Sequence, residues 1–279
     1  MEVRNFTKAE ILDMHNLSFM TSEGDILLTN DKVIKIFKRT NGDYFSNKLF
    51  TIHALADDIN LKKIKELVLP EKIITVDDKI IGFTMPFKKG VTLEEYLESN
   101  IPLELKIEAL KKVGLILEKM KMLRKVDDMP DFFINDLHEK NFIINPSTKE
   151  VSVVDLDSCS INGNLKFGSK YLSYLTPLDN FKKYEKVKAF TCGADYIPSE
   201  ETDLYCYSII VLNFISNTNF HRLSIEEAKK YFDYLDSIGL NKELLNNLSK
   251  IYSEDKNVNI SYNLDSIKEV IGKSRIKIR

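Results

Sequence analysis

The first 90 residues contain four short runs in which apolar positions alternate with polar or basic ones. A period of two with many β-branched residues is typical of strands that bury one face. The predicted strands are Asp25 to Leu28, Lys32 to Lys38, Lys72 to Val76 and Lys79 to Pro86. Turns are predicted at Thr29-Asn30-Asp31 and Asp77-Asp78. One helix, from about Tyr44 to Asp58, is expected between the two strand pairs. A short helix before them is expected to face the core through Ile11, Leu12 and Met14.

From residue 92 onward the apolar positions recur mainly at helical spacing. Thr92, with Glu95 three residues later, has the sequence of a capping box at a helix start. A long amphipathic helix is predicted from about Leu103 to Lys125. Its core-facing stripe consists of Ile107, Leu110, Val113, Leu117 and Met120. Further helices are predicted from residue 203 and at 224–238, 241–252 and 263–271, so the chain as a whole is expected to be α+β.

A predicted β-hairpin interrupts the helical part at residues 142–154, with the turn at Asn145-Pro146-Ser147. Asp136, Asn141 and Asp155 lie at the two ends of this hairpin. Two carboxylates and an amide oxygen can bind a hard divalent cation and orient a hydroxyl. Phosphoryl transfer depends mostly on such positioning and charge neutralisation, so these residues are candidates for that chemistry.

Their spacing resembles the catalytic and metal-binding loops of the protein kinase superfamily, HRDxxxxN followed by a strand pair and DFG. The counterparts here are Ile134-Asn135-Asp136 with Asn141, and Asp155-Leu156-Asp157. The resemblance implies a divergent, two-lobed kinase-like α+β fold, with a small β-rich lobe at residues 1–87 and a larger, mainly helical lobe at 88–279. It also implies that ATP binds between the lobes with Mg²⁺, or Mn²⁺ in its place. Asp136 would act on the acceptor hydroxyl, and Asn141 and Asp155 would hold the metal.

The strand KVIKIFK resembles the kinase strand whose Lys contacts the α- and β-phosphates. This resemblance gives the phosphate role to Lys35, with Lys38 as the alternative register. Two features depart from the family. The usual Gly-rich loop, which brings backbone amides to the phosphates, is represented by Gly24 alone. The helix Glu that pairs with the Lys falls, counted from Lys35, within residues 50–54, which contain no acid; Asp57 fits only the Lys38 register.

Two further segments extend the resemblance. MPFKKG resembles the kinase hinge, which implies that Met85 lies behind an adenine ring and that the backbone of Pro86 and Lys88 meets its edge. The segment that starts at Asp203 resembles the kinase DxYxxG helix. Asp203 would then bond backbone amides of the catalytic loop. It could also, or instead, cap its own helix.

Residues 158–200 have weak periodicity and are expected to form the activation and substrate-docking segment. They include the phosphorylatable residues Ser160, Ser169, Tyr171, Ser173 and Thr176. In many kinases an Arg before the catalytic Asp pairs with a phosphate on this segment. Asn135 stands in that place here and carries no charge. Any activity is therefore expected not to depend on phosphorylation of the segment.

The composition is that of an ordinary globular protein. Hydrophobic residues make up 43% of the 279 positions and charged residues 29%, and the formal net charge is −2. These values indicate neither a nucleic-acid nor a membrane surface, and no apolar run reaches the ~18 residues of a membrane span. The charged N-terminus does not resemble a signal peptide. Cys159, Cys192 and Cys206 are too scattered for a disulfide framework or a zinc site, so reduced thiols and a cytoplasmic location are expected.

Three functions remain open on the sequence. The preferred one is an ATP- and Mg²⁺-dependent kinase acting on Ser or Thr of a protein substrate. A small-molecule phosphotransferase of the aminoglycoside or choline kinase-like kind is the second, because Asp136-Leu137-His138 is common in that branch. The short connection between hinge and catalytic loop argues against it. The third is a pseudokinase that serves as a binding or scaffold module, which the poor Gly loop and the missing helix acid support.

Overall fold

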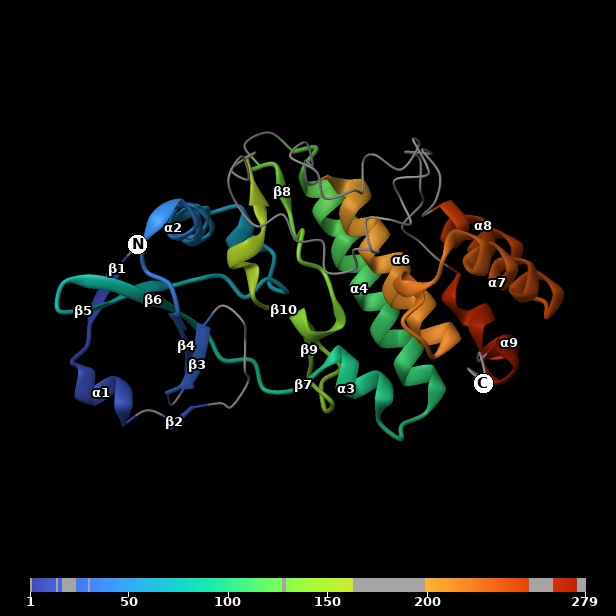
Figure 1. Cartoon of the computed structure of the whole chain (residues 1–279), viewed down its shortest axis with the longest axis horizontal. Coiled ribbons are helices and arrows are strands. Elements are labelled where there is room, and N and C mark those ends of the chain that lie inside the picture. The colour runs from blue at the N-terminus through green and yellow to red at the C-terminus, as the bar shows by residue number, and fades with distance from the viewer. Residues whose placement is uncertain are drawn as a thin grey trace.

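The structure is a computed structural model that describes residues 2–13, 15–16, 24–29, 31–126, 129–162, 199–250 and 263–274. Within these residues the chain is α+β, with a β-rich N-terminal part and a mainly helical C-terminal part. Figure 1 shows the N-terminal sheet at one end of the molecule and the last helices at the opposite end. This arrangement is compatible with two lobes.

A six-stranded sheet forms the N-terminal part, in the order β1-β5-β6-β4-β3-β2. Its strands are β1 (Glu2–Asn5), β2 (His15–Asn16), β3 (Gly24–Leu28), β4 (Lys32–Phe37), β5 (Lys72–Val76) and β6 (Lys79–Pro86). Neighbouring strands are antiparallel, except that β1 is parallel to β5. The four strands predicted from alternation are confirmed, whereas β1 and β2 lie outside them. Asp77 and Asp78 form the predicted turn between β5 and β6, with φ of 49° and 60°.

Both faces of the sheet are covered, which explains the alternation along β4. Val33 and Phe37 pack with Ile52 of the helix α2 (Gly42–Asp57). Ile34 points to the other face, where a second apolar cluster includes Phe6. The short helix α1 (Lys8–Leu12) adds Ile11 to this second cluster, as predicted. The prediction for Leu12 was wrong, since 83% of it is exposed, and Met14 lies outside the described residues.

The C-terminal part is built on α3 (Leu93–Glu98), α4 (Leu103–Leu123), α6 (Glu200–Ser216), α7 (Ile225–Ser237), α8 (Lys242–Ser249) and α9 (Ile267–Ser274). The capping box predicted at Thr92 is present: its side chain accepts from the Glu95 N–H at 3.2 Å, and the Glu95 carboxylate accepts from the Thr92 N–H at 2.8 Å. All five residues of the predicted α4 stripe are buried. α6 starts at Glu200, with Ser199 as its N-cap, before the predicted start at Asp203.

The long helices α4 and α6 approach closely at Gly114. The Tyr207 hydroxyl on α6 donates to the Leu110 carbonyl on α4 at 2.8 Å. A Cβ on Gly114 would lie only 2.7 Å from the same hydroxyl oxygen. A glycine is therefore required at this position of α4 for the buried tyrosine to fit.

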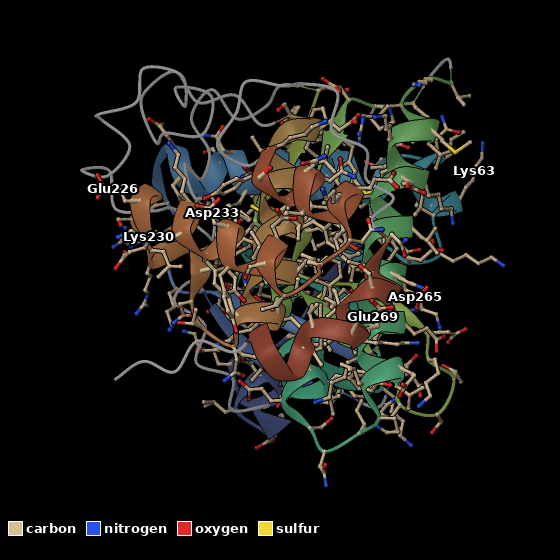
Figure 2. The ribbon with its side chains drawn as sticks, turned by 90° about the vertical axis from the view of Figure 1, so that its right-hand side faces the viewer. Lys63, Glu226, Lys230, Asp233, Asp265 and Glu269 are labelled. Atoms are coloured by element: carbon tan, nitrogen blue, oxygen red, sulfur yellow. The ribbon has the colours of Figure 1, made fainter. Side chains whose placement is uncertain are left out.

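The far end of the helical part carries charge on its outer surface. Figure 2 shows Glu226, Lys230 and Asp233 projecting from α7, and Asp265 and Glu269 from the last helical segment. The opposite face of α7 is apolar, with Ala228 and Leu235 fully buried among the other helices. This pattern is that of solvated amphipathic helices. Within the described part of the chain, the helices are too short or too polar to span a membrane.

The predicted hairpin is confirmed as β9 (Phe142–Ile144) and β10 (Val151–Val153), which pair antiparallel. β7 (Val91–Thr92) adds a third strand to β9. A separate two-stranded ribbon joins β8 (Phe132–Phe133) to β11 (Ser160–Ile161). These short strands fix the start and the end of the segment that carries Asp136 and Asp155.

Candidate functional site

Lys35 lies in the middle of the N-terminal sheet and reaches residues of the C-terminal part. It pairs with Ile26 of β3 on one side and Phe83 of β6 on the other. Its side chain is 1% exposed, and its Nζ donates to Asp157 Oδ1 at 2.9 Å and to Asp155 Oδ1. The structure thus brings Lys35 together with Asp155. Lys38 lies beyond the end of β4 and is exposed.

A left-handed turn places the two carboxylates. Asp155 has φ 60° and ψ 46°, between β10 and the 3-10 turn η3 (Leu156–Ser158). Aspartate is one of the few non-glycine residues that adopt this conformation readily. The side chain of Asp155 keeps 31% of its surface exposed, whereas that of Asp157 is 0% exposed. Asp155 is therefore the carboxylate that a ligand can reach.

Helix α2 contributes a lysine side chain to this cluster rather than an acid. Lys48 is buried, and its Nζ donates to Asp157 Oδ2 at 2.7 Å and to Ser158 Oγ at 3.2 Å. Asp157 thus binds one lysine through each carboxylate oxygen. Asp57, the acid that the Lys38 register would need, is exposed at the end of α2. Sequence reasoning missed Lys48, although a charged residue one turn before the buried Ile52 was a usable signal.

The four charges of this cluster balance one another. Burial acts to raise the pKa of Asp157, but Lys35 and Lys48 outweigh it and hold that pKa well below its usual range. Burial likewise acts to lower the pKa of Lys35, and the two carboxylates raise it instead. Burial raises the pKa of Asp155 to about 7, with Lys35 opposing and Asp157 reinforcing the change. Asp155 is thus the member that takes up a proton first as the pH falls.

Asp203 anchors the loop that carries Asp136. Its carboxylate accepts the backbone N–H groups of Ile134 and Asn135, each at 2.9 Å, so the predicted bonds to the backbone of this loop are confirmed. The helix-cap alternative is wrong, since Ser199 is the N-cap of α6. Burial raises the pKa of Asp203 to about 6, although the two backbone bonds oppose it.

Asn135 itself is fully buried. It adopts a left-handed conformation with φ 63°. Its side-chain amide donates to the Ser158 carbonyl at 3.1 Å, which ties the loop before Asp136 to the end of η3. The residue in the place of the kinase Arg therefore has a structural contact inside the protein.

Asn141 lies between Asp136 and Asp155. Its Nδ2 donates to the Asp136 carbonyl at 2.8 Å, which leaves Oδ1 as the atom that would bind a metal. The Asn141 carbonyl accepts the Val154 N–H at 2.9 Å, so Asp155 follows directly beside Asn141. This backbone hydrogen bond therefore places Asn141 opposite Val154, the residue before Asp155.

Asp136 is partly exposed, with 25% of its side chain accessible, and its Oδ2 lies 4.0 Å from His138 Nε2. His138 Nδ1 accepts the Lys140 N–H at 3.2 Å and caps the 3-10 turn Glu139–Asn141. Burial lowers the pKa of His138, while Asp136 opposes the change. Nε2 is therefore the ring nitrogen that lies on the side of Asp136. The loop contact accounts for the orientation of His138 without a ligand.

The donor set suits a metal that arrives with a phosphate ligand. Asn141 and Asp155 supply oxygen donors, and among the described residues no group of three or more His, Cys, Asp and Glu could hold a metal ion. Mg²⁺ usually binds through one or two protein carboxylates together with water and substrate phosphates. A Mg²⁺–nucleotide complex fits these residues better than a free cation does.

The predicted hinge residues lie at the end of β6, next to the strand that carries Lys35. Met85 pairs with Val33 and is buried against the α2 face of the sheet. Pro86 pairs with Lys32 at the end of the same ladder. Lys88 is partly exposed in the connection that follows. Met85 therefore lies two residues along β6 from Phe83, the residue that pairs with Lys35.

No protein-family model and no curated protein matches the chain. The resemblance to kinases therefore rests on the sequence motifs alone. Gly24 begins β3 and pairs with Phe37, while residues 17–23 before it lie outside the described residues. So do residues 163–198, which include Cys192 and most of the expected activation segment.

Proposed function

We propose that the protein is an ATP- and Mg²⁺-dependent phosphotransferase that moves the γ-phosphate of ATP to a hydroxyl, with protein Ser or Thr as the preferred acceptor. The proposal rests on the contact between Lys35 and Asp155, next to Asn141. Lys35 of the N-terminal sheet donates to Asp155, and a backbone hydrogen bond places Asn141 opposite the residue before Asp155. Phosphoryl transfer needs such a combination of fixed charges around a nucleotide.

Each residue then has one task in the reaction. Lys35 neutralises charge on the nucleotide phosphates. Asn141 and Asp155 would hold Mg²⁺, which would supply positive charge beside the phosphate oxygens. Asp136 orients the acceptor hydroxyl and takes its proton as the oxygen bonds to the γ-phosphorus. The bond from phosphorus to the bridging oxygen breaks, and ADP leaves with that electron pair. Asp203 keeps the loop in place through the backbone of Ile134 and Asn135.

A cavity beside the catalytic loop favours a small acceptor as the second candidate. Its volume is about 1110 Å³, and its lining includes His138, Glu139 and Asn213. Pockets for small molecules have volumes of roughly 300–1,000 Å³, so this slightly larger cavity has room for a compact polar acceptor. A transfer assay with both acceptor types separates the two candidates.

Transfer from γ-labelled ATP tests the proposal directly. The wild type is incubated with Mg²⁺ or Mn²⁺, and label is followed on the protein itself, on a Ser/Thr peptide library and on polyhydroxylated amines. Asp136→Asn is expected to lose transfer at least a hundredfold while nucleotide affinity stays within about threefold, because Asp136 contacts the acceptor. A wild type that binds ATP but labels no acceptor with either metal would be a nucleotide-binding module.

A further inference from the structure

We propose that Lys48 is a positioning residue for nucleotide binding, which acts through Asp157 to hold Lys35 in place. The inference rests on the proposed function and adds a residue to it. In the family that the motifs resemble, a helix Glu holds the phosphate-binding Lys directly. Here the helix contributes the opposite charge, and the carboxylate comes from the metal loop.

The contacts of Asp157 support an indirect action of Lys48 on Lys35. Asp157 Oδ1 accepts from Lys35 at 2.9 Å, and Asp157 Oδ2 accepts from Lys48 at 2.7 Å. A carboxylate held on both sides has a fixed orientation, so it offers Lys35 an acceptor at a fixed point. Ser158 Oγ gives Lys48 a second acceptor on the same turn, at 3.2 Å. The buried side chain of Asp157 in η3 therefore links Lys48 of α2 to Lys35 of β4.

Charge explains why two lysines are needed. Without Lys48, Lys35 would face two carboxylates alone, and the cluster would carry a net negative charge in a buried site. Such a cluster repels the phosphates that Lys35 is expected to attract, and it draws Lys35 away from them. With Lys48 present, Asp157 remains neutralised when Lys35 shifts from Asp155 to a phosphate. Lys48 thus allows Lys35 to leave Asp155 for a phosphate, while Asp157 still holds Lys35 in position.

Nucleotide affinity in two backgrounds tests the link. The dissociation constant of Mg²⁺ with a non-hydrolysable ATP analogue is measured by calorimetry for the wild type, Lys48→Met, Asp157→Asn and the double variant. Lys48→Met is expected to weaken binding at least tenfold in the wild type. In the Asp157→Asn background the same change is expected to alter affinity by less than threefold, because the residue through which Lys48 acts is already neutral.

Lys119→Met is the control for loss of a lysine–carboxylate pair away from the cluster, since the more exposed Lys119 binds the carboxylate of Glu66 at 2.7 Å. Its affinity should equal that of the wild type. Equal losses from Lys48→Met in both backgrounds, or no loss in the wild type, would overturn the role of Lys48 alone. A wild type that binds no nucleotide would overturn the proposed function as well. If Lys48→Met does not fold, Lys48→Gln, which removes the charge but keeps a polar side chain, replaces it in both backgrounds with the same expected results.

Discussion

Replacing Gly114 with alanine tests how closely α4 and α6 pack against each other. The new Cβ would lie 2.7 Å from the Tyr207 hydroxyl oxygen and 3.1 Å from its Cζ. Tyr207 is 1% exposed, so the ring has little room to move. Its hydroxyl also bonds the Leu110 carbonyl at 2.8 Å, and a shift of the ring would break that bond.

Three effects set the size of the change. Overpacking a buried site costs about 1–3 kcal/mol, and loss of the Tyr207 hydrogen bond adds about 1 kcal/mol. Alanine is favoured over glycine in a helix interior by about 1 kcal/mol, so the net loss for Gly114→Ala is about 1–3 kcal/mol. Gly272→Ala is the control, because among the described residues no neighbouring atom lies within 4 Å of a Cβ at this position of α9. Only the helix propensity then acts, and stability should rise by up to about 1 kcal/mol.

Urea unfolding followed by circular dichroism measures both variants against the wild type. The midpoint is expected to fall for Gly114→Ala and to rise or stay constant for Gly272→Ala, with unchanged slopes. A Gly114→Ala chain as stable as the wild type would refute the close-packing argument. The opposite signs of the two variants exclude helix propensity as the common cause.

Two further predictions concern the loop that Asp203 supports. Asp203→Asn leaves one acceptor oxygen for the N–H groups of Ile134 and Asn135 and should destabilise the fold by about 1–3 kcal/mol. Because the folded-state pKa of Asp203 is raised to about 6, its contribution is full below the unfolded-state pKa and is lost as the pH rises through 6. The deficit of the variant should therefore be larger at pH 4.5 than at pH 7, and an equal deficit at both values would contradict the burial argument. Phosphatase treatment, checked by mass spectrometry, should leave the initial transfer rate unchanged, because the buried Asn135 cannot pair with a phosphate on residues 158–200. A loss of tenfold or more, about 1.4 kcal/mol of barrier, that rephosphorylation restores would show that another cation has this role.

The strands of the N-terminal sheet could be predicted where local signals define them. Alternation located β3 to β6, and Asp77-Asp78 supplied residues that tolerate positive φ. β1 could not be predicted in this way. Its four residues are all exposed, so they show no alternation, and its pairing with β5 joins positions 70 residues apart.

The candidate site was predictable to a similar extent. The spacing of Asp136, Asn141 and Asp155 is local and follows from one hairpin. The choice between Lys35 and Lys38 as the phosphate-contacting residue depends on which side chain faces α2. The sequence of a single strand does not determine this. The bond from Lys48 to Asp157 links residues 109 positions apart, and the search for an acid on the helix overlooked a cation there.

Metal-dependent nucleotide binding at Asp155 tests the central claim most directly. Thermal unfolding is measured with ATP in the presence of Mg²⁺ and in the presence of a chelator. Since a ligand at a hundred times its dissociation constant stabilises the folded state by about 2.7 kcal/mol, the wild type should gain stability only with the metal.

Asp155→Asn should lose most of this metal-dependent gain. Glu150→Gln, an exposed carboxylate at the other end of the same hairpin, should retain it. An Mg²⁺ response in Asp155→Asn equal to that of the wild type, or no response in the wild type itself, would contradict the assignment of this site.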